Sequence, residues 1–139
     1  MKSIFLLFLF MNGVLSGKPT EEGEKIKAEL VGVEYYSMNI CKDTYPVYVR
    51  VLYSLNTKDI SNFKMKHSFS DDITAIIPVN ETDKKGNVVY GFCTTFDDIK
   101  NFTTVFINAE GDQSNPVNVT VNVKEGKIIA GTAPVTIKN

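Results

Sequence analysis

Apolar side chains recur at every second position through most of this chain. The clearest run lies in residues 47–55, where Val47, Val49, Val51 and Tyr53 share one phase. A period of two is typical of a β-strand that buries one face. Segments rich in Asn, Asp and Gly separate such runs at a spacing of about ten residues, as turns do between strands. The sequence therefore predicts an all-β protein.

The number of such runs predicts one antiparallel β-sandwich of about seven to eight strands. The expected strands cover residues 26–35, 47–55, 63–69, 73–79, 88–93, 105–109 and 117–123. The alternation slips after residue 30, so we expect a β-bulge near Gly32. Residues 95–100 allow one helical turn at most.

The first residues have the layout of a secretory signal peptide. A positive start at Lys2 precedes an apolar run over residues 4–11, and small residues follow at Ser16 and Gly17. The run is too short to span a bilayer. We expect a signal peptide at 1–16, a flexible leader at 17–25 and the sandwich domain at 26–139. A buried amphipathic helix or a membrane anchor is the alternative, but polar residues follow the run.

Secretion decides how the two cysteines are interpreted. In the oxidising secretory pathway, Cys41 and Cys93 are expected to form a disulfide bond, and two free thiols are the alternative. With one histidine in the chain and the two cysteines far apart, we expect no zinc site. We expect no metal site overall; calcium at the acidic loop ends Asp71-Asp72, Asp97-Asp98 and Glu110-Gly111-Asp112 is the alternative, since adjacent Asp residues usually form turns. The mature chain is expected to be extracellular, with no membrane insertion.

The charge balance excludes one class of partner. Lys and Arg total 15 against 16 Asp and Glu, which gives a net charge of −1. Such a chain has no electrostatic footprint for nucleic acid. A hydrophobic content of 43% also excludes a disordered chain.

Candidate catalytic groups are few. His67 is the one histidine, and its phase with Met65 and Phe69 places it on the inward face of a strand. A small hydrolase would depend on this residue. No nucleophile-elbow, zinc-protease or phosphate-binding motif accompanies it. We expect no enzyme activity and no cofactor.

Three Asn-x-Thr sequons begin at Asn80, Asn101 and Asn118. Asn80 precedes a turn, Asn101 starts a strand, and Asn118 lies on the polar face opposite a valine stripe. Each is therefore expected to reach water. Together with the signal peptide, they predict N-glycosylation in a eukaryotic host.

Tyrosines cluster around the first two expected strands. Tyr36 and Tyr48 fall out of phase with the clearest apolar stripes, so we expect one or both to be exposed. Exposed aromatic rings suit both sugar stacking and protein recognition. The possible binding surface is therefore Tyr36, Tyr48 and Arg50. The alternative is that these tyrosines reflect ordinary strand propensity.

The stretch 103–123 carries a resemblance to known sandwiches. An alternating strand reaches Ala109, a turn contains Gly111 and Ser114, and Pro116 precedes a final strand rich in Val and Thr. This order resembles the last two strands of fibronectin type III and related Ig-like domains. The resemblance implies an Ig-like β-sandwich.

A second resemblance concerns function. Asn39-Ile40 followed by Pro46-Val47-Tyr48-Val49-Arg50 is similar to a region of starch-binding carbohydrate-binding modules of family 21. The tryptophan that follows this strand in that family is absent here. We therefore expect a secreted, non-catalytic module that recognises an extracellular protein or cell-surface partner. A polysaccharide-binding module of starch-binding type is the alternative.

Overall fold

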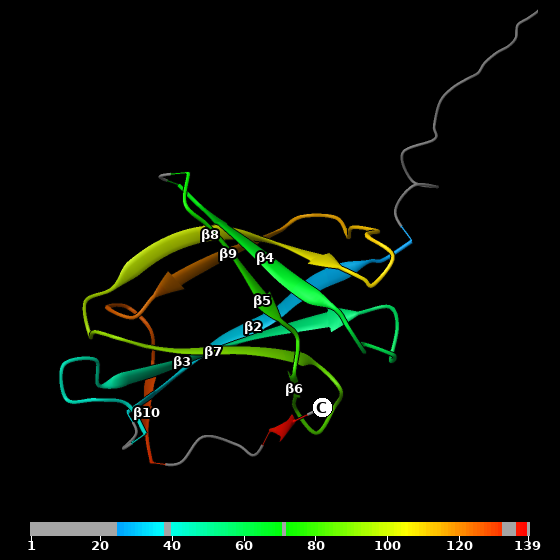
Figure 1. Cartoon of the computed structure of the whole chain (residues 1–139). Helices are drawn as coiled ribbons and strands as arrows, with labels where there is room; N and C mark the ends of the chain where they lie inside the picture. Colours follow the sequence, from blue (N-terminus) through cyan, green and yellow to red (C-terminus); the bar gives the residue numbers. More distant parts are fainter. Residues whose placement is uncertain (1–24, 38–39, 71, 132–135, 139) are drawn as a thin grey trace, which may run out of the picture.

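A computed structural model describes residues 25–37, 40–70, 72–131 and 136–138. The described residues form ten strands in two sheets and no helix (Figure 1). The predicted signal peptide and all of the leader except Lys25 lie outside the described residues. The strands are β2 (Ala28–Ser37), β3 (Val47–Leu55), β4 (Lys64–Phe69), β5 (Thr74–Pro78), β6 (Glu81–Thr82), β7 (Val88–Thr94), β8 (Ile99–Ile107), β9 (Val117–Asn122), β10 (Ile128–Ala130) and β11 (Ile137–Lys138).

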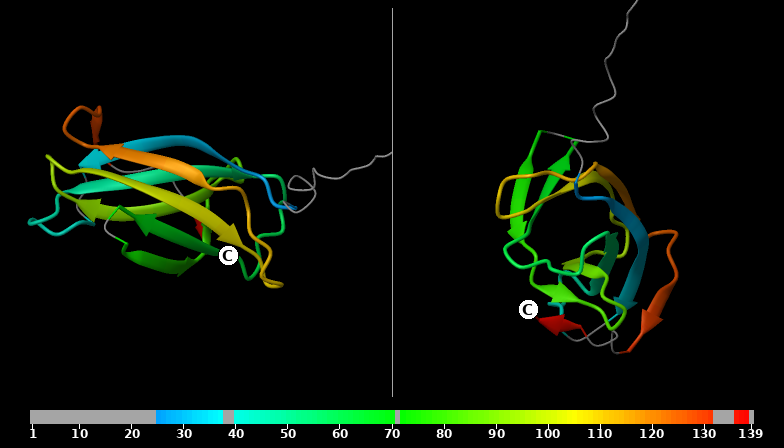
Figure 2. Two further views of the ribbon diagram at one scale, coloured as in Figure 1. Left: turned by 90° about the horizontal axis from the view of Figure 1, so that it is seen from above. Right: turned by 90° about the vertical axis from the view of Figure 1, so that its right-hand side faces the viewer.

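The two sheets are unequal in size. The six-stranded sheet has the order β10-β2-β3-β7-β6-β11, and the four-stranded sheet has the order β5-β4-β8-β9. Seen along the strands and from above, the two sheets lie over each other as layers around one interior (Figure 2). Along the described strands the chain passes between the sheets four times, in the connections β3–β4, β5–β6, β7–β8 and β9–β10. The prediction of a two-sheet, all-β fold is confirmed. The expected number of seven to eight strands was too low, because β6, β10 and β11 have only two or three residues each and are too short to show a period of two.

Side chains from the inner faces of both sheets form the core. Val47, Val49, Val51 and Tyr53 of β3 have no exposed surface. They belong to one cluster with buried residues of the opposite sheet, namely Met65, Phe102, Phe106, Val119 and Val121. Burial of each large apolar side chain contributes roughly 1.5–3 kcal/mol. The period of two therefore predicted the buried phase of β3 correctly.

The expected bulge is also present. The pairing of β2 with β3 shifts register between Leu30 and Gly32, where the alternation slips in the sequence. The extra residue shifts the inward-facing positions of β2 from even-numbered residues before the bulge to odd-numbered residues after it. As a result, Ala28 and Tyr35 both reach the core cluster from one strand.

Two expectations about individual strands were wrong. The sandwich is not wholly antiparallel, because β10 pairs in parallel with β2, with Ile128 opposite Tyr35. The strand expected at 105–109 begins at Ile99 and ends at Ile107. Residues 95–98 form a turn in which the Asp98 amide donates to the Thr95 carbonyl, and β8 follows directly at Ile99. Polar residues that alternate on both faces of β8 conceal its first half in the sequence.

The edge strands of the six-stranded sheet are short. In the six-stranded sheet the edge strands β10 and β11 have three and two residues. At the start of β2, the Asn115 side chain accepts a hydrogen bond from the Ala28 amide and donates one to the Ala28 carbonyl, both at 2.9 Å. The amide of Asn115 thereby pairs with Ala28 as a neighbouring strand would.

Candidate functional site

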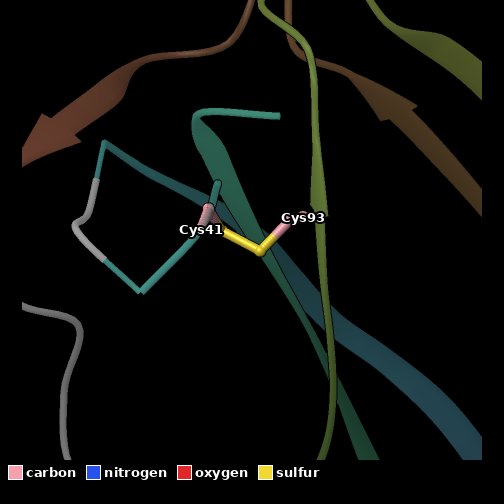
Figure 3. The surroundings of a disulfide bond; sticks show 2 residues. All are labelled: Cys41 and Cys93. Carbon is pink, nitrogen blue, oxygen red and sulfur yellow. A yellow bond between two sulfur atoms is a disulfide. The ribbon is translucent and has the colours of Figure 1, made fainter. Parts of the chain in front are cut away.

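The predicted disulfide bond is present. Cys41 lies in the connection between β2 and β3, and Cys93 lies on β7 (Figure 3). Their Cα atoms are 5.8 Å apart, within the usual range for a disulfide. Structural disulfides persist in oxidising compartments, so the bond is compatible with an extracellular location.

Tyr36, Tyr48 and Arg50 lie close together on the outward face of the six-stranded sheet. Tyr36 is paired with Tyr48 across β2 and β3, and Arg50 is paired with Glu34. The Glu34 carboxylate accepts hydrogen bonds from the Tyr36 hydroxyl at 2.8 Å and from Arg50 Nη1 at 2.9 Å. One carboxylate therefore fixes both of the other side chains against the sheet.

This surface is less exposed than the sequence predicted. Tyr36 is 4% exposed, Arg50 is 2% exposed, and Tyr48 is half-buried. The expected exposure of Tyr36 was therefore wrong. The physical reason is local contact: the Glu34 carboxylate binds the Tyr36 hydroxyl and Arg50, and the Tyr48 ring lies over Gly91, where a Cβ atom would be 2.1 Å from the Tyr48 hydroxyl oxygen. Burial and the hydrogen bond to Glu34 raise the pKa of Tyr36, so its phenol remains a donor.

His67 lies in the interior between the sheets, as its phase predicted. It has no exposed surface, and its Nδ1 atom is 2.9 Å from the Thr104 hydroxyl oxygen. That hydroxyl is 2.8 Å from the Tyr53 hydroxyl, and the imidazole stacks on the Tyr90 ring at 4.2 Å between centroids. Burial lowers the pKa of His67 to about 4, so the ring is neutral at pH 7. The residue has the environment of a core histidine.

An open cleft lies at the end of the sandwich where β2 begins and β3 and β8 end. Its volume is about 440 Å³. We call it the loop cleft; its walls are formed by residues of three segments, 25–26, 56–63 and 108–110. The middle segment connects β3 to β4, and the last belongs to the connection from β8 to β9.

Side chains of the loop cleft hold its own backbone. The Asp59 carboxylate accepts a hydrogen bond from the Ser61 amide at 3.2 Å. Hydrogen bonding from the Ser61 side chain, together with this bond from the amide, lowers the pKa of Asp59. Across the cleft, Asn108 Oδ1 accepts from the amides of Glu110 at 3.0 Å and Asp112 at 2.8 Å. Such bonds fix turns locally without strand pairing. Both connections are therefore shaped before any ligand arrives.

The sequence predictions did not include the loop cleft. Its signal was present as clusters of Asn, Asp, Ser and Thr in residues 56–62 and 108–112, which were interpreted as turns. Nothing in either cluster predicts that the two turns lie side by side. Only the sandwich topology brings them together in space.

The three predicted glycosylation acceptors, Asn80, Asn101 and Asn118, are all exposed. Asn80 lies between β5 and β6, whereas Asn101 and Asn118 lie on the adjacent strands β8 and β9. Within the described ranges, no group of three His, Cys, Asp or Glu side chains is arranged to hold a metal ion. The same residues contain no helix of the length and hydropathy needed to cross a membrane.

Comparisons with known proteins return no relative. No family model matches the chain, and neither the curated proteins nor the solved structures contain a match. The fold and the loop cleft are therefore described from this chain's own residues.

Proposed function

We propose that this chain is a secreted, non-catalytic binding module that recognises an extracellular protein or cell-surface partner through the loop cleft. The observation that carries this proposal is the position of the cleft between two connections whose turns are fixed by their own side chains. Fixed loops on a rigid sheet scaffold are where many proteins place their binding residues.

The strand order supports an Ig-like class. With β2, β3, β7 and β6 taken as strands A, B, E and D, and β4, β8 and β9 as C, F and G, the two sheets have the A-B-E-D and C-F-G orders. In this correspondence β5 is the additional strand C′. The resemblance of residues 103–123 to the last two strands of fibronectin type III domains points to the same assignment.

This correspondence also relates the loop cleft to particular strand connections of an Ig-like domain. Its two main walls correspond to the B–C and F–G connections. In immunoglobulin variable domains these connections carry binding loops at one end of the sandwich. The analogy is one of fold, and it selects the end of this molecule at which a partner is expected.

The chemistry of the cleft favours a protein over a polysaccharide. Charged groups line it, with Lys25 on one wall and Asp59 and Glu110 on the others. Its aromatic residue, Phe63, is 7% exposed and offers little ring surface for sugar stacking. Three amide side chains, Asn56, Asn62 and Asn108, would suit sugar hydroxyls, and they support the polysaccharide-binding alternative.

Two further features support the rest of the proposal. The disulfide bond and the apolar run at 4–11 favour secretion. The burial and neutral state of His67 favour a non-catalytic role, because a general base must reach its substrate.

The test is binding of the labelled secreted chain to intact cells of the organism that makes it. The double variant Ala109→Arg/Glu110→Lys fills the cleft and reverses one charge at exposed positions. We expect saturable binding that this variant weakens more than tenfold, about 1.4 kcal/mol. The matched control, Ala130→Arg/Glu125→Lys, makes the same changes at exposed positions away from the cleft and should bind normally.

Treatment of the cells separates the two partner classes. Mild protease treatment should abolish binding if the partner is a protein, and periodate oxidation of glycans should leave it intact. Retention of the chain on insoluble starch, chitin or glucan, lost in the cleft variant, would support the polysaccharide alternative instead. Equal binding by both double variants would overturn the loop cleft as the site.

A further inference from the structure

Two of the three sequons face each other across neighbouring strands. In the pairing of β8 with β9, Asn101 is opposite Thr120, and Thr103 is opposite Asn118. The Thr120 hydroxyl donates a hydrogen bond to Asn101 Oδ1 at 2.8 Å, and the Thr103 hydroxyl donates one to Asn118 Oδ1 at 3.1 Å. The threonine of each sequon thus holds the asparagine of the other.

These hydrogen bonds leave the reactive atoms free. N-glycosylation joins Nδ2 of asparagine to C1 of the first sugar. The nitrogen displaces a lipid diphosphate from C1 of the lipid-linked oligosaccharide, so that an N–C bond forms, a C–O bond breaks and the nitrogen loses one proton. Both cross-strand bonds use Oδ1, and no described residue accepts a hydrogen bond from Nδ2 of Asn101 or Asn118. The folded sheet can therefore keep both bonds after modification.

The two acceptors are close enough for their glycans to interfere. Asn101 and Asn118 are diagonal neighbours on the outer face of the four-stranded sheet, a relationship that places their Cα atoms roughly 7–8 Å apart. Both side chains are exposed and start on the same face. Two branched glycans that begin at this separation must lie against each other.

The surface around this pair suits carbohydrate. A groove of about 500 Å³ runs beside it, lined by Ser68, Ser70 and the four sequon residues, with no charged side chain in its lining. A second hollow adjoins it, shares Phe69, Ser70 and Asn101, and includes the charged Lys100. That hollow is lined also by Ile73 and Ile99, which are 57% and 54% exposed. Hydroxyls, amides and exposed apolar side chains match the two kinds of surface that a sugar ring presents.

We infer that Asn101 and Asn118 form a coupled double glycosylation site. Its two N-glycans begin side by side, cover the outer face of β8 and β9 together with Ile99, and hinder each other's enzymatic processing. Asn80 has no sequon opposite it and is an independent site. The inference rests on the secretion that is part of the proposed function, and it leaves the loop cleft as the open end of the molecule.

The test uses the full chain expressed in eukaryotic secretory cells and recovered from the medium. No Lys or Arg lies between residues 101 and 118, so cleavage at Glu110 or Asp112 is needed to separate the two sites for glycopeptide mass spectrometry. In the natural sequence we expect both sites to be occupied by incompletely trimmed, mannose-rich glycans. Asn101→Gln should raise the fully processed fraction at Asn118 severalfold, and Asn118→Gln should do the same at Asn101.

Two controls keep the inference separable from folding and from secretion. Asn80→Gln removes a sequon that is not paired and should change the glycans at neither site. On the natural chain, native enzymatic deglycosylation should release the glycans of the pair severalfold more slowly than that of Asn80, even if a variant fails to fold. Unchanged processing in both single variants, or an unoccupied acceptor in the pair, overturns the inference. Absence of the natural chain from the medium would instead contradict the proposed secretion.

Discussion

At the scale of single residues, His67 links stability to pH. Its imidazole has no exposed surface, and burial lowers its pKa to about 4, below the value near 6.5 of an unfolded histidine. The unfolded chain therefore binds a proton at higher pH than the folded chain does. The contribution of neutral His67 to the free energy of unfolding is complete above about pH 6.5 and is lost as the pH falls toward 4.

We expect His67 to account for a loss of about 3 kcal/mol in the free energy of unfolding across this window. Urea denaturation at a series of pH values measures it. The variant His67→Gln keeps a polar group beside Thr104 but does not titrate. Its free energy of unfolding should therefore fall by about 3 kcal/mol less than that of the natural chain between about pH 6.5 and pH 4. Parallel curves for the two proteins would show that other groups cause the acid sensitivity.

The residue scale also shows what alternation can predict. The phase of His67 with Met65 correctly predicted its inward direction, because the period of two is a property of the strand itself. The exposure of Tyr36 was not predictable in this way. Phase tells which face a side chain occupies, whereas contacts between side chains, such as those of Glu34 with Tyr36 and Arg50, affect how exposed each one is.

At the scale of elements, the contact of β2 with β9 depends on Gly126. The Asn122 amide at the end of β9 donates a hydrogen bond to the Tyr35 hydroxyl of β2 at 2.9 Å. A Cβ atom at Gly126 would lie 2.4 Å from the Tyr35 ring and 3.0 Å from the Asn122 carbonyl oxygen. The Tyr35 ring therefore cannot move away from a Cβ atom at residue 126 without loss of its hydrogen bond to the Asn122 amide.

We expect Gly126→Ala to lower the free energy of unfolding by about 1–3 kcal/mol. Gly32→Ala is the matched control, since a Cβ atom at Gly32 meets nothing within 4 Å. Denaturation midpoints of the two variants and the natural chain measure the difference. An equal effect of both substitutions would mean that the contact with Tyr35 is not the cause.

Elements were predictable in proportion to their length and to the regularity of their pattern. The nine residues of β3 were predicted because their apolar face is continuous. The three residues of β10 were not, since Ile128–Ala130 is too short for a period and its parallel pairing depends on Tyr35 far away in the chain. In β8, the buried Thr104 and the exposed Asn101 conceal the alternation.

At the scale of the whole molecule, the disulfide bond ties the connection before β3 to β7. Cys41 and Cys93 are separated by 52 residues. By the chain-entropy model, a loop of this length contributes about 4 kcal/mol to stability. We expect the double variant Cys41→Ala/Cys93→Ala to lose roughly this amount.

The measurement is chemical denaturation with and without a thiol reductant. Reduction should lower the stability of the natural chain to that of the double variant, and it should leave the variant unchanged. A double variant as stable as the oxidised chain would contradict a stabilising role for the bond.

The short edges of the six-stranded sheet limit polymerisation of the whole molecule. A stray extended chain can add to a sheet only along an edge with unpaired amides and carbonyls. Here β10 and β11 present three and two residues, and the Asn115 amide already occupies the groups of Ala28. In the four-stranded sheet, the edge strand β5 ends at Pro78, which has no amide hydrogen to donate, and the other edge strand, β9, has six residues. The edges of the six-stranded sheet therefore offer few free groups to which a second copy of the chain could add as a further strand.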